Sequence, residues 1–352
     1  MQVKTNSLKA WILAARPKTL TGAVAPVLVG AVFGFCLLCY GGGDADWKRC
    51  IIPTTLCLLF AILMQIDANL INDYFDFKKG SDTKERLGPE RACSQGWITP
   101  RAMKTGIAIT TVLAFVTGLP LIWYGGWITL AVGLICIFGA FLYTTRLSYI
   151  GLGDFLVVLF FGLVPVFFTF HVIIWHGADF ASLKTATQWE GAIITYLFFG
   201  WMPLFGGLGV GLVTNNLLII NNYRDREQDA AIEKNTLVVR LGAKTAEWLY
   251  LINGIIGVLI LFLVCSCWKS GLLTGLYSEA EIESMPKTFP FHLLAGMLFF
   301  PFLFSAHRKM VKINHGRELN AVLGETARNI LIYSILFVVS IIIVTLQVWY
   351  SR

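Results

Sequence analysis

Long apolar stretches separated by short polar connections are the dominant pattern of this sequence. A run of about 20 apolar residues is long enough to cross a bilayer as a helix. Because the runs are continuous rather than alternating, they predict transmembrane helices and not the strands of a membrane barrel. Nine runs are present, at 19–40, 51–72, 103–124, 126–145, 152–175, 191–220, 246–268, 289–306 and 327–350. The chain is therefore predicted to be an all-α polytopic membrane protein with nine transmembrane helices.

The overall composition agrees with a membrane protein. Hydrophobic residues make up 56% of the chain and charged residues only 14%, against roughly a quarter in soluble domains. The formal net charge of +7 does not indicate a nucleic-acid partner, because basic loops that face anionic membrane lipid produce the same excess. The eight cysteines fall mostly inside the apolar runs, so they are predicted to be structural thiols.

Basic residues are distributed unevenly between the two sets of connections. The N-terminal segment and every second connection after it contain 22 of the 28 Lys and Arg residues. The positive-inside rule places that set of connections in the cytoplasm. With nine helices, the N-terminus is then cytoplasmic and the C-terminus lies outside. These features predict a multi-pass protein of the cytoplasmic (inner) membrane.

The acidic residues on the predicted cytoplasmic side are concentrated at the ends of two apolar runs, in segments 69–82 and 221–229. Four polar residues of the first segment share one helix face through i, i+3, i+4, i+7 spacing: Asn69, Asn72, Asp73 and Asp76. Asp225 and Asp229 share a face of the second segment in the same way. Carboxylates at membrane depth are costly and usually functional, so a site is predicted at this end of the helices.

The two acidic segments also resemble each other. Both read Asn-x-Tyr-x-Asp, from Asn72 to Asp76 and from Asn221 to Asp225, 149 positions apart. Each ends an apolar run and opens a basic connection. This repetition predicts an internal duplication within a single domain, 1–352, with two pseudo-repeated halves at roughly 1–150 and 151–352 whose half-sites face one central cavity.

Basic residues surround both acidic segments, and the combination indicates a particular chemistry. Oxygen ligands without His or Cys favour Mg²⁺, which binds a few carboxylates together with substrate phosphates. Lys and Arg can neutralise the remaining phosphate charge. A diphosphate held at the end of an apolar helix bundle indicates a lipid diphosphate as the substrate. Helix capping with salt bridges at the membrane surface, or an ion path of a transporter, are the alternative interpretations.

At these residues the chain resembles the UbiA superfamily of intramembrane prenyltransferases, whose members have nine helices and two aspartate-rich motifs. The motifs stand here as Asn72-Asp73-x-x-Asp76 and Asp225-x-x-x-Asp229. The resemblance covers nearly the whole chain and is nearest to the branch that prenylates 1,4-dihydroxy-2-naphthoate in menaquinone biosynthesis. Its supporting strings are Ala14-Ala-Arg16-Pro-Lys18-Thr-Leu20, Gly80-Ser-Asp82, Gly88-Pro-Glu-Arg91 and Gly151-Leu-Gly153-Asp154. The last acid of the first motif is at Asp82, two positions later than the commoner spacing, as in the naphthoate branch.

The resemblance implies a reaction and a set of residues for it. A polyprenyl group passes from polyprenyl diphosphate to 1,4-dihydroxy-2-naphthoate, with loss of CO₂ and diphosphate, and gives demethylmenaquinol. The implied ligands of Mg²⁺ are Asn72, Asp73, Asp76, Asp82, Asp225 and Asp229. The implied catalytic residues are Asp76, Asp82, Asp225, Asp229 and Arg146, where Arg146 replaces a commoner Lys. The implied substrate-binding residues are Asn69, Asn72, Lys78, Arg86, Arg91, Tyr143, Lys234 and Arg16.

Several residues keep two interpretations from the sequence alone. Asp67 is either a packing residue or a support for the ligands, and Asp154 is either a helix cap or part of the site. Arg16 either anchors the topology or reaches the anionic substrate. His171 is predicted to be non-catalytic, because it lies at the outer side, far from the acids. A different acceptor, such as 4-hydroxybenzoate, haem or a glycerol lipid, is compatible with the same motifs.

Overall fold

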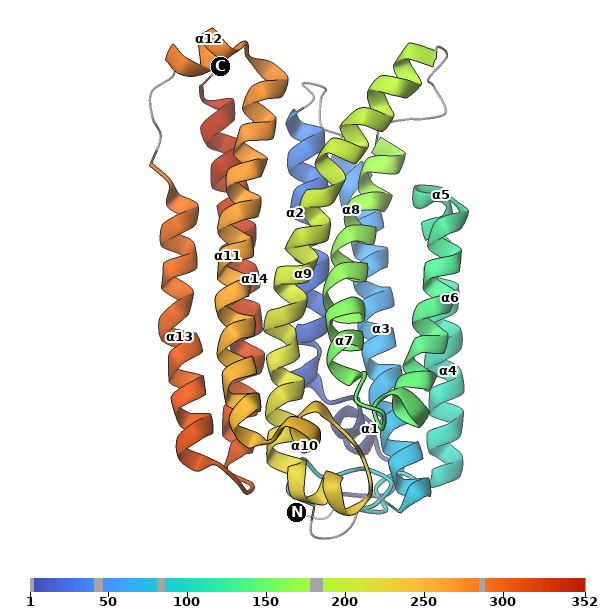
Figure 1. The fold of residues 1–352 in the computed structure, drawn as a ribbon. Coiled ribbons are helices and arrows are strands. Elements are labelled where there is room, and N and C mark those ends of the chain that lie inside the picture. The colour runs from blue at the N-terminus through green and yellow to red at the C-terminus, as the bar shows by residue number, and fades with distance from the viewer. Residues whose placement is uncertain (1–2, 41–46, 81–85, 178–185, 285–288, 352) are drawn as a thin grey trace.

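The computed structural model describes residues 3–40, 47–80, 86–177, 186–284 and 289–351, and the regular secondary structure of these residues is helical (Figure 1). The helices are α1 (Leu8–Ala15), α2 (Thr21–Tyr40), α3 (Trp47–Lys79), α4 (Pro100–Gly118), α5 (Leu121–Gly125), α6 (Trp127–Leu142), α7 (Gly153–Val158), α8 (Val164–Gly177), α9 (Ala186–Ala231), α10 (Leu237–Leu241), α11 (Ala243–Leu276), α12 (Glu279–Ser284), α13 (Phe291–Ile313) and α14 (Leu319–Trp349). The long helices run side by side as one bundle, and the two chain ends lie at its opposite ends.

Seven helical segments within the described residues are long and apolar enough to cross a membrane. They are Thr21–Cys39, Arg49–Lys79, Trp127–Leu147, Gly153–Trp175, Phe199–Ala231, Ala243–Gly275 and Leu319–Trp349. The other two predicted runs, 103–124 and 289–306, lie mostly in α4 and α13, which are helical but are not among the seven. The all-α, multi-span prediction is confirmed. The count of nine spans and the side of the membrane that each terminus faces stay predictions.

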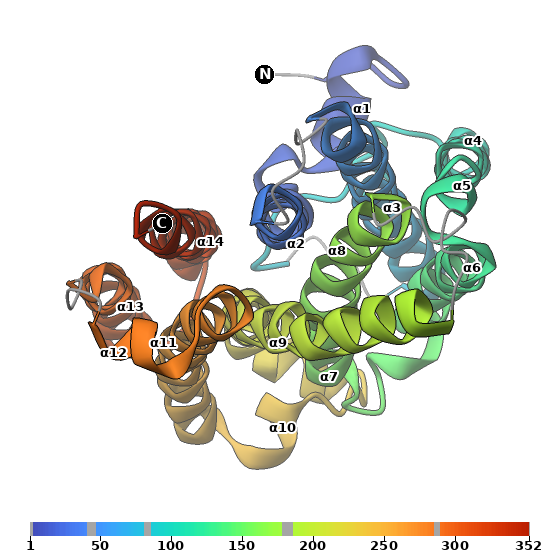
Figure 2. The same cartoon turned by 90° about the horizontal axis from the view of Figure 1, so that it is seen from above.

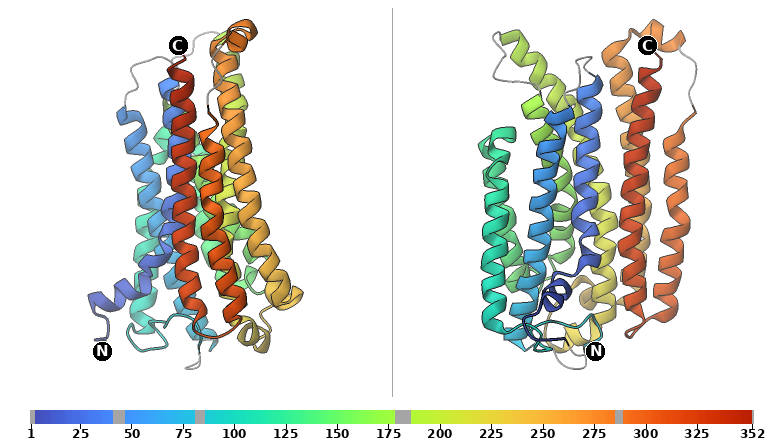
Figure 3. Two further views of the ribbon diagram at one scale, coloured as in Figure 1. Left: turned by 90° about the vertical axis from the view of Figure 1, so that its left-hand side faces the viewer. Right: turned by 180° about the vertical axis from the view of Figure 1, so that it is seen from behind.

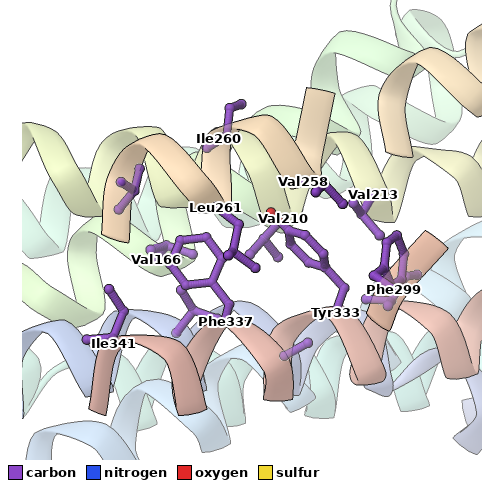
Figure 4. Close-up of a cluster of buried hydrophobic side chains, with 14 of the residues drawn as sticks. Val166, Val210, Val213, Val258, Ile260, Leu261, Phe299, Tyr333, Phe337 and Ile341 are labelled. Atoms are coloured by element: carbon purple, nitrogen blue, oxygen red, sulfur yellow. The ribbon is translucent and has the colours of Figure 1, made fainter. Parts of the chain in front are cut away.

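The long helices form two sides of the bundle, whose arrangement is visible from above in Figure 2. Helices α11, α13 and α14 gather on one side, α3, α4 and α6 lie on the other, and α2 and α9 stand between them. The first side is filled by one large cluster of buried apolar side chains, part of which Figure 4 shows around Tyr333 and Phe337. The second side contains the cavity described below.

The backbone of α9 packs directly against the backbone of the turn Leu159–Leu163 in the middle of the bundle. A Cβ atom at Gly162 would lie 2.3 Å from the carbonyl oxygen of Gly207, which is far inside van der Waals contact. The glycines of α9 therefore allow the two backbones to touch, as small residues commonly do between membrane helices. The helix remains continuous through Pro203.

A polar contact recurs in both halves of the chain. Asp67 on α3 accepts hydrogen bonds from Thr110 and Thr111 of α4, the latter at 2.8 Å. Asn216 on α9, 149 positions after Asp67, donates to the carbonyl of Tyr250 in α11 at 3.0 Å. Both residues thus connect a motif-bearing helix to the next long helix. This is a further likeness between the halves, and the internal duplication itself stays a prediction.

Candidate active site

A cavity of about 320 Å³ lies among α2, α3, α4, α6, α8 and α9. Its wall is mostly apolar, and most of its polar residues belong to the end of the cavity where the aspartate motifs begin. At this end the polar lining residues are Arg16, Thr19, Gln65, Asn69, Asn72, Tyr143 and Asn221, and Thr129, Thr169 and Thr214 line the rest of the cavity. Asn72 and Asn221 begin the two related motifs, so the structure brings both motifs to one cavity. One helical turn further on, on the same faces, stand Asp76 and Asp225.

The first acidic segment holds the connection between α3 and α4 in place. The buried carboxylate of Asp73 accepts hydrogen bonds from the backbone N–H groups of Ala92 and Cys93, at 2.8 and 2.9 Å. Asp76 pairs with the guanidinium of Arg91 at 2.7 Å. The segment 86–93, here called the strap, is therefore fixed to the end of α3. Asp73 has a structural role in addition to the predicted metal ligation.

The amide residues of the first segment position their neighbours along the cavity. Asn69 donates to the carbonyl of Ala15 at 3.0 Å and to the hydroxyl of Thr19 at 3.1 Å. These bonds hold the 3₁₀ turn Pro17–Thr19 against α3. Asn72 accepts a hydrogen bond of 2.8 Å from the hydroxyl of Thr144. Asn69 and Asn72 therefore fix the mouth of the cavity from two sides.

Arg16 occupies the polar end of the cavity with an unusual backbone. Its φ of 52° lies in the left-handed region, and this conformation ends α1, which Figure 3 shows lying obliquely beside the lower ends of the long helices. Burial, followed by the nearby cations Arg91 and Arg86, lowers the pKa of Arg16 to about 9. Its Nη2 atom is buried with no hydrogen-bond partner among the described residues. A buried cation beside other cations is a suitable binding group for an anion.

The second acidic segment is held by its own basic residues. The guanidinium of Arg224 donates two hydrogen bonds to the carboxylate of Asp225, at 2.7 and 2.6 Å. Lys234 contacts one carboxylate oxygen of Asp229 at 3.1 Å. The other oxygen of Asp229 is buried and has no hydrogen-bond partner among the described residues. This arrangement leaves an oxygen ligand at the second half-site.

Asn320 at the start of α14 joins the two half-sites. It accepts a hydrogen bond of 2.7 Å from Arg224 and donates one of 2.9 Å to the carbonyl of Leu87 in the strap. A Cβ atom at Gly88 would come within 2.6 Å of the Arg224 guanidinium, so the strap passes directly over that side chain. The strap is thus fixed to the first motif at one end and to the second motif at the other.

Two π-helical turns shape the cavity wall, at Tyr143–Leu147 after α6 and at Leu159–Leu163 between α7 and α8. Tyr143 and two residues of the second turn, Phe160 and Phe161, line the cavity. Such turns are rare and occur frequently at functional sites. Here they contribute three aromatic side chains to the cavity wall.

Several other predicted residues are not part of the cavity wall. Lys78 and Arg146 are exposed and do not line it, and Asp82 falls outside the described residues. Arg86 donates to the carbonyl of Pro89 within the strap at 3.2 Å. Their predicted roles in substrate binding and catalysis are not tested by this geometry. Within the described parts of the chain, no three His, Cys, Asp or Glu side chains are grouped closely enough to hold a metal ion alone.

The structure shows the contacts of Asp67 and Asp154, whose roles the sequence alone did not decide, and of His171. Asp67 does not line the cavity and has the packing contacts given above. Asp154 lies in the first turn of α7 and accepts a hydrogen bond of 3.0 Å from Asn215 of α9. His171 contacts the carbonyl of Gly125 and the hydroxyl of Tyr196, both at 2.9 Å, away from the acids. Asn320 was not anticipated from the sequence, because it belongs to neither motif.

Comparison with known proteins agrees with this geometry. The sequence matches the UbiA prenyltransferase family over residues 23–280. It is 36% identical over 247 residues to a 1,4-dihydroxy-2-naphthoate octaprenyltransferase of Haemophilus influenzae, covering 68% of this chain and 71% of the relative. It is 30% identical over 334 residues to the Mycobacterium tuberculosis protein of the same description, covering 94% and 95%.

Solved structures share the fold. One is a UbiA homolog from Archaeoglobus fulgidus bound to DMAPP and Mg²⁺, with a TM-score of 0.54 and 15% sequence identity over 95% of this chain and 98% of that one. The fold and site thus define a multi-span membrane protein with a polar site at one end of an apolar cavity. The chain belongs to the UbiA prenyltransferase family.

Proposed function

We propose that this protein transfers a polyprenyl group from polyprenyl diphosphate to 1,4-dihydroxy-2-naphthoate and releases diphosphate and CO₂. The observation that carries the proposal is the apolar cavity, at whose polar end both aspartate motifs meet. An amphipathic donor matches such a cavity, because its chain is apolar and its head group is anionic. The naphthoate acceptor is supported by the relatives that have this description.

The donor set at the polar end fits Mg²⁺. It consists of oxygens, and the buried oxygen of Asp229 that has no hydrogen-bond partner in the described parts of the chain is available to a cation. Asp76, Asp225 and Asp229 would hold the ion, with Asp73, Asp82 and Asn72 as further candidates. When bound, Mg²⁺ neutralises the diphosphate and makes it a better leaving group. A metal that binds few carboxylates and relies on phosphate oxygens is compatible with the absence of a three-residue cluster in the described residues.

The chain's own residues perform the remaining tasks in this proposal. Arg16, Arg86, Arg91 and Lys234 bind the diphosphate as its bond to the prenyl group breaks. The aromatic wall that includes Tyr143, Phe160 and Phe161 faces the allylic carbon and stabilises its developing positive charge. The electron-rich naphthoate ring attacks that carbon, the new C–C bond forms, and CO₂ leaves with its electrons returned to the ring. The active site faces the cytoplasm in this proposal, in agreement with the basic connections.

An acceptor assay tests the proposal. Purified protein in lipid, supplied with Mg²⁺, a polyprenyl diphosphate and 1,4-dihydroxy-2-naphthoate, should form demethylmenaquinol that mass spectrometry detects. EDTA should stop the reaction and added Mg²⁺ should restore it. Full activity in EDTA would contradict the proposed role of Mg²⁺. Prenylation of 4-hydroxybenzoate or a glycerol lipid in preference to the naphthoate would show that the acceptor is that compound. Transport is not proposed, because the acids of both motifs gather at one end of the helices.

A further inference from the structure

The cavity has a measurable depth and a distinct outer end. It follows α3 from Asn72 at the polar end to Cys57, which are 15 residues apart and therefore about 22 Å by the helical rise of 1.5 Å per residue. Its outermost lining residues are Cys57, Leu121, Thr129 and Val172. Leu121 begins α5, the short helix at the upper end of α4 and α6 in Figure 1.

At that end, helix α5 packs directly against α6 and α8. A Cβ atom at Gly125 would lie 2.5 Å from Cγ2 of Thr129 and 2.8 Å from Cγ1 of Val172. These distances are well below van der Waals contact, so only a residue without a side chain fits here. At Gly125, α5 is therefore in direct contact with side chains of α6 and α8, and no prenyl chain fits between them at this position.

Hydrogen bonds of His171 on α8 hold α5 in this position. Its ring is buried, and Nε2 lies 2.9 Å from the carbonyl oxygen of Gly125 while Nδ1 lies 2.9 Å from the hydroxyl of Tyr196. A carbonyl oxygen can only accept, so Nε2 carries the proton and donates it. Nδ1 of the neutral ring then accepts a hydrogen bond from Tyr196. This chain of two bonds connects α5 to α8 and α9.

We propose that α5, positioned by His171, is an end stop that determines how many prenyl units the cavity encloses. The inference rests on the proposed function and adds the determinant of donor length. Units up to the depth of the cavity are surrounded by protein, and further units of a longer donor turn aside at α5. Donor affinity should therefore rise with each added unit and then level off. The chain length at which it levels off is here called the break point.

A binding series with two opposite substitutions tests the end stop. Non-hydrolysable prenyl diphosphate analogues with one to eight units are measured against the purified protein in lipid nanodiscs with Mg²⁺. Affinity should increase at least about tenfold from the shortest analogue to the break point. Cys57→Phe fills the outer end and should move the break point to a shorter chain. Leu121→Ala opens it and should move the break point to a longer chain.

Matched variants separate the end stop from general effects on folding. Leu298→Ala makes the same change as Leu121→Ala on the exposed face of α13 and should leave the break point unchanged. His171→Ala removes both hydrogen bonds and should move the break point toward longer chains. Tyr196→Phe keeps the bond to Gly125 and should move it less. A general loss of stability lowers binding of all analogues equally and does not reproduce this order.

A photoreactive group at the far end of a four-unit analogue gives an independent readout without turnover. Cross-links to α5 or the adjacent residues of α6 and α8 support the end stop. Cross-links to α11 or α14, or a break point that neither Cys57→Phe nor Leu121→Ala moves while short analogues bind normally, overturn it. Failure of every prenyl diphosphate to bind rejects the proposed function itself, which is a different result.

Discussion

The two sides of the bundle differ in packing although they contain related motifs. In the apolar windows of α3 and α6, only 22% and 17% of residues are buried inside the protein, against 50% for α11 and 44% for α14. The side formed by α11, α13 and α14 is closed by a continuous core in which Tyr333 and Phe337 are fully buried. The side formed by α3, α4 and α6 encloses the cavity. The bundle is therefore hollow on one side and filled by apolar side chains on the other.

The polar ends of the two sides remain equivalent despite this difference. Asp76 pairs with Arg91, and Asp225 pairs with Arg224. Each carboxylate follows, by one helical turn, an Asn that lines the cavity. The packing of the apolar part thus differs between the two sides, whereas α3 and α9 have similar charged ends.

The largest expected effect tests whether both motifs are needed. Asp76→Asn and Asp225→Asn should each lower kcat/KM by about 100-fold or more, because each removes a charge that balances metal and diphosphate. The measurement is the steady-state rate of prenyl transfer at saturating Mg²⁺. Glu283→Gln, on α12 at the opposite end of the bundle, is the matched control and should retain full activity. A variant of only one motif that stays fully active contradicts the shared site.

The second prediction compares one substitution on the two sides. Phe337→Ala removes a fully buried ring from the core and should cost about 3–5 kcal/mol in the free energy of unfolding. Phe161→Ala removes a ring that already borders the cavity, so it should cost only about 1 kcal/mol. Reversible unfolding in mixed micelles measures both. Equal losses would show that the cavity side is packed as tightly as the core.

The third prediction concerns the connection between the two half-sites. Asn320→Ala removes the bonds to Arg224 and to the strap and should lower kcat/KM by about 10-fold. Asn320→Asp can still accept from Arg224 but cannot donate to Leu87. If the strap bond is the important one, both variants are impaired alike. Wild-type activity of Asn320→Ala would mean that the half-sites do not depend on this connection.

The smallest expected effect concerns the residues that connect each motif-bearing helix to its neighbour. Asp67→Asn places at position 67 the residue type found at the corresponding position 216. One of the two hydrogen bonds from Thr110 and Thr111 is lost, so stability should fall by about 1 kcal/mol. Activity at 25 °C should be unchanged. A large loss of activity would instead assign Asp67 to the site.

The sequence predicted the parts of the structure that depend on local pattern. All nine apolar runs lie mostly in helices, and seven of the helical segments in the described residues are long and apolar enough to cross a membrane. The motif at 72–76 and the one at 221–225 were recognisable because spacing along one helix face needs no tertiary information. Asn72 and Asn221, the first residues of the two motifs, line the same cavity.

Other features depend on contacts between distant segments and were not predictable. Asn320 bonds to residues 96 and 233 positions away, and no local signal marks it. Asp73 had the spacing of a metal ligand, yet its oxygens accept bonds from Ala92 and Cys93 of the strap. His171 contacts the carbonyl of Gly125 in α5, which lies 46 positions away along the chain, so no local pattern could have indicated this contact.

The π-helical turn at Leu159–Leu163 has a consequence for how this sequence can vary. A π turn holds one residue more than the α-helix around it, so it resembles a tolerated one-residue insertion. Deleting Leu159 should convert Gly153–Gly177 into an uninterrupted α-helix. The parts before and after the deletion would keep nearly the same relative orientation, because the wider π turn covers about the same angle with one residue more than an α turn. Leu156 and Val157 would still face the cavity, so a one-residue gap in this turn should be tolerated more often among active relatives than a gap elsewhere in Gly153–Gly177.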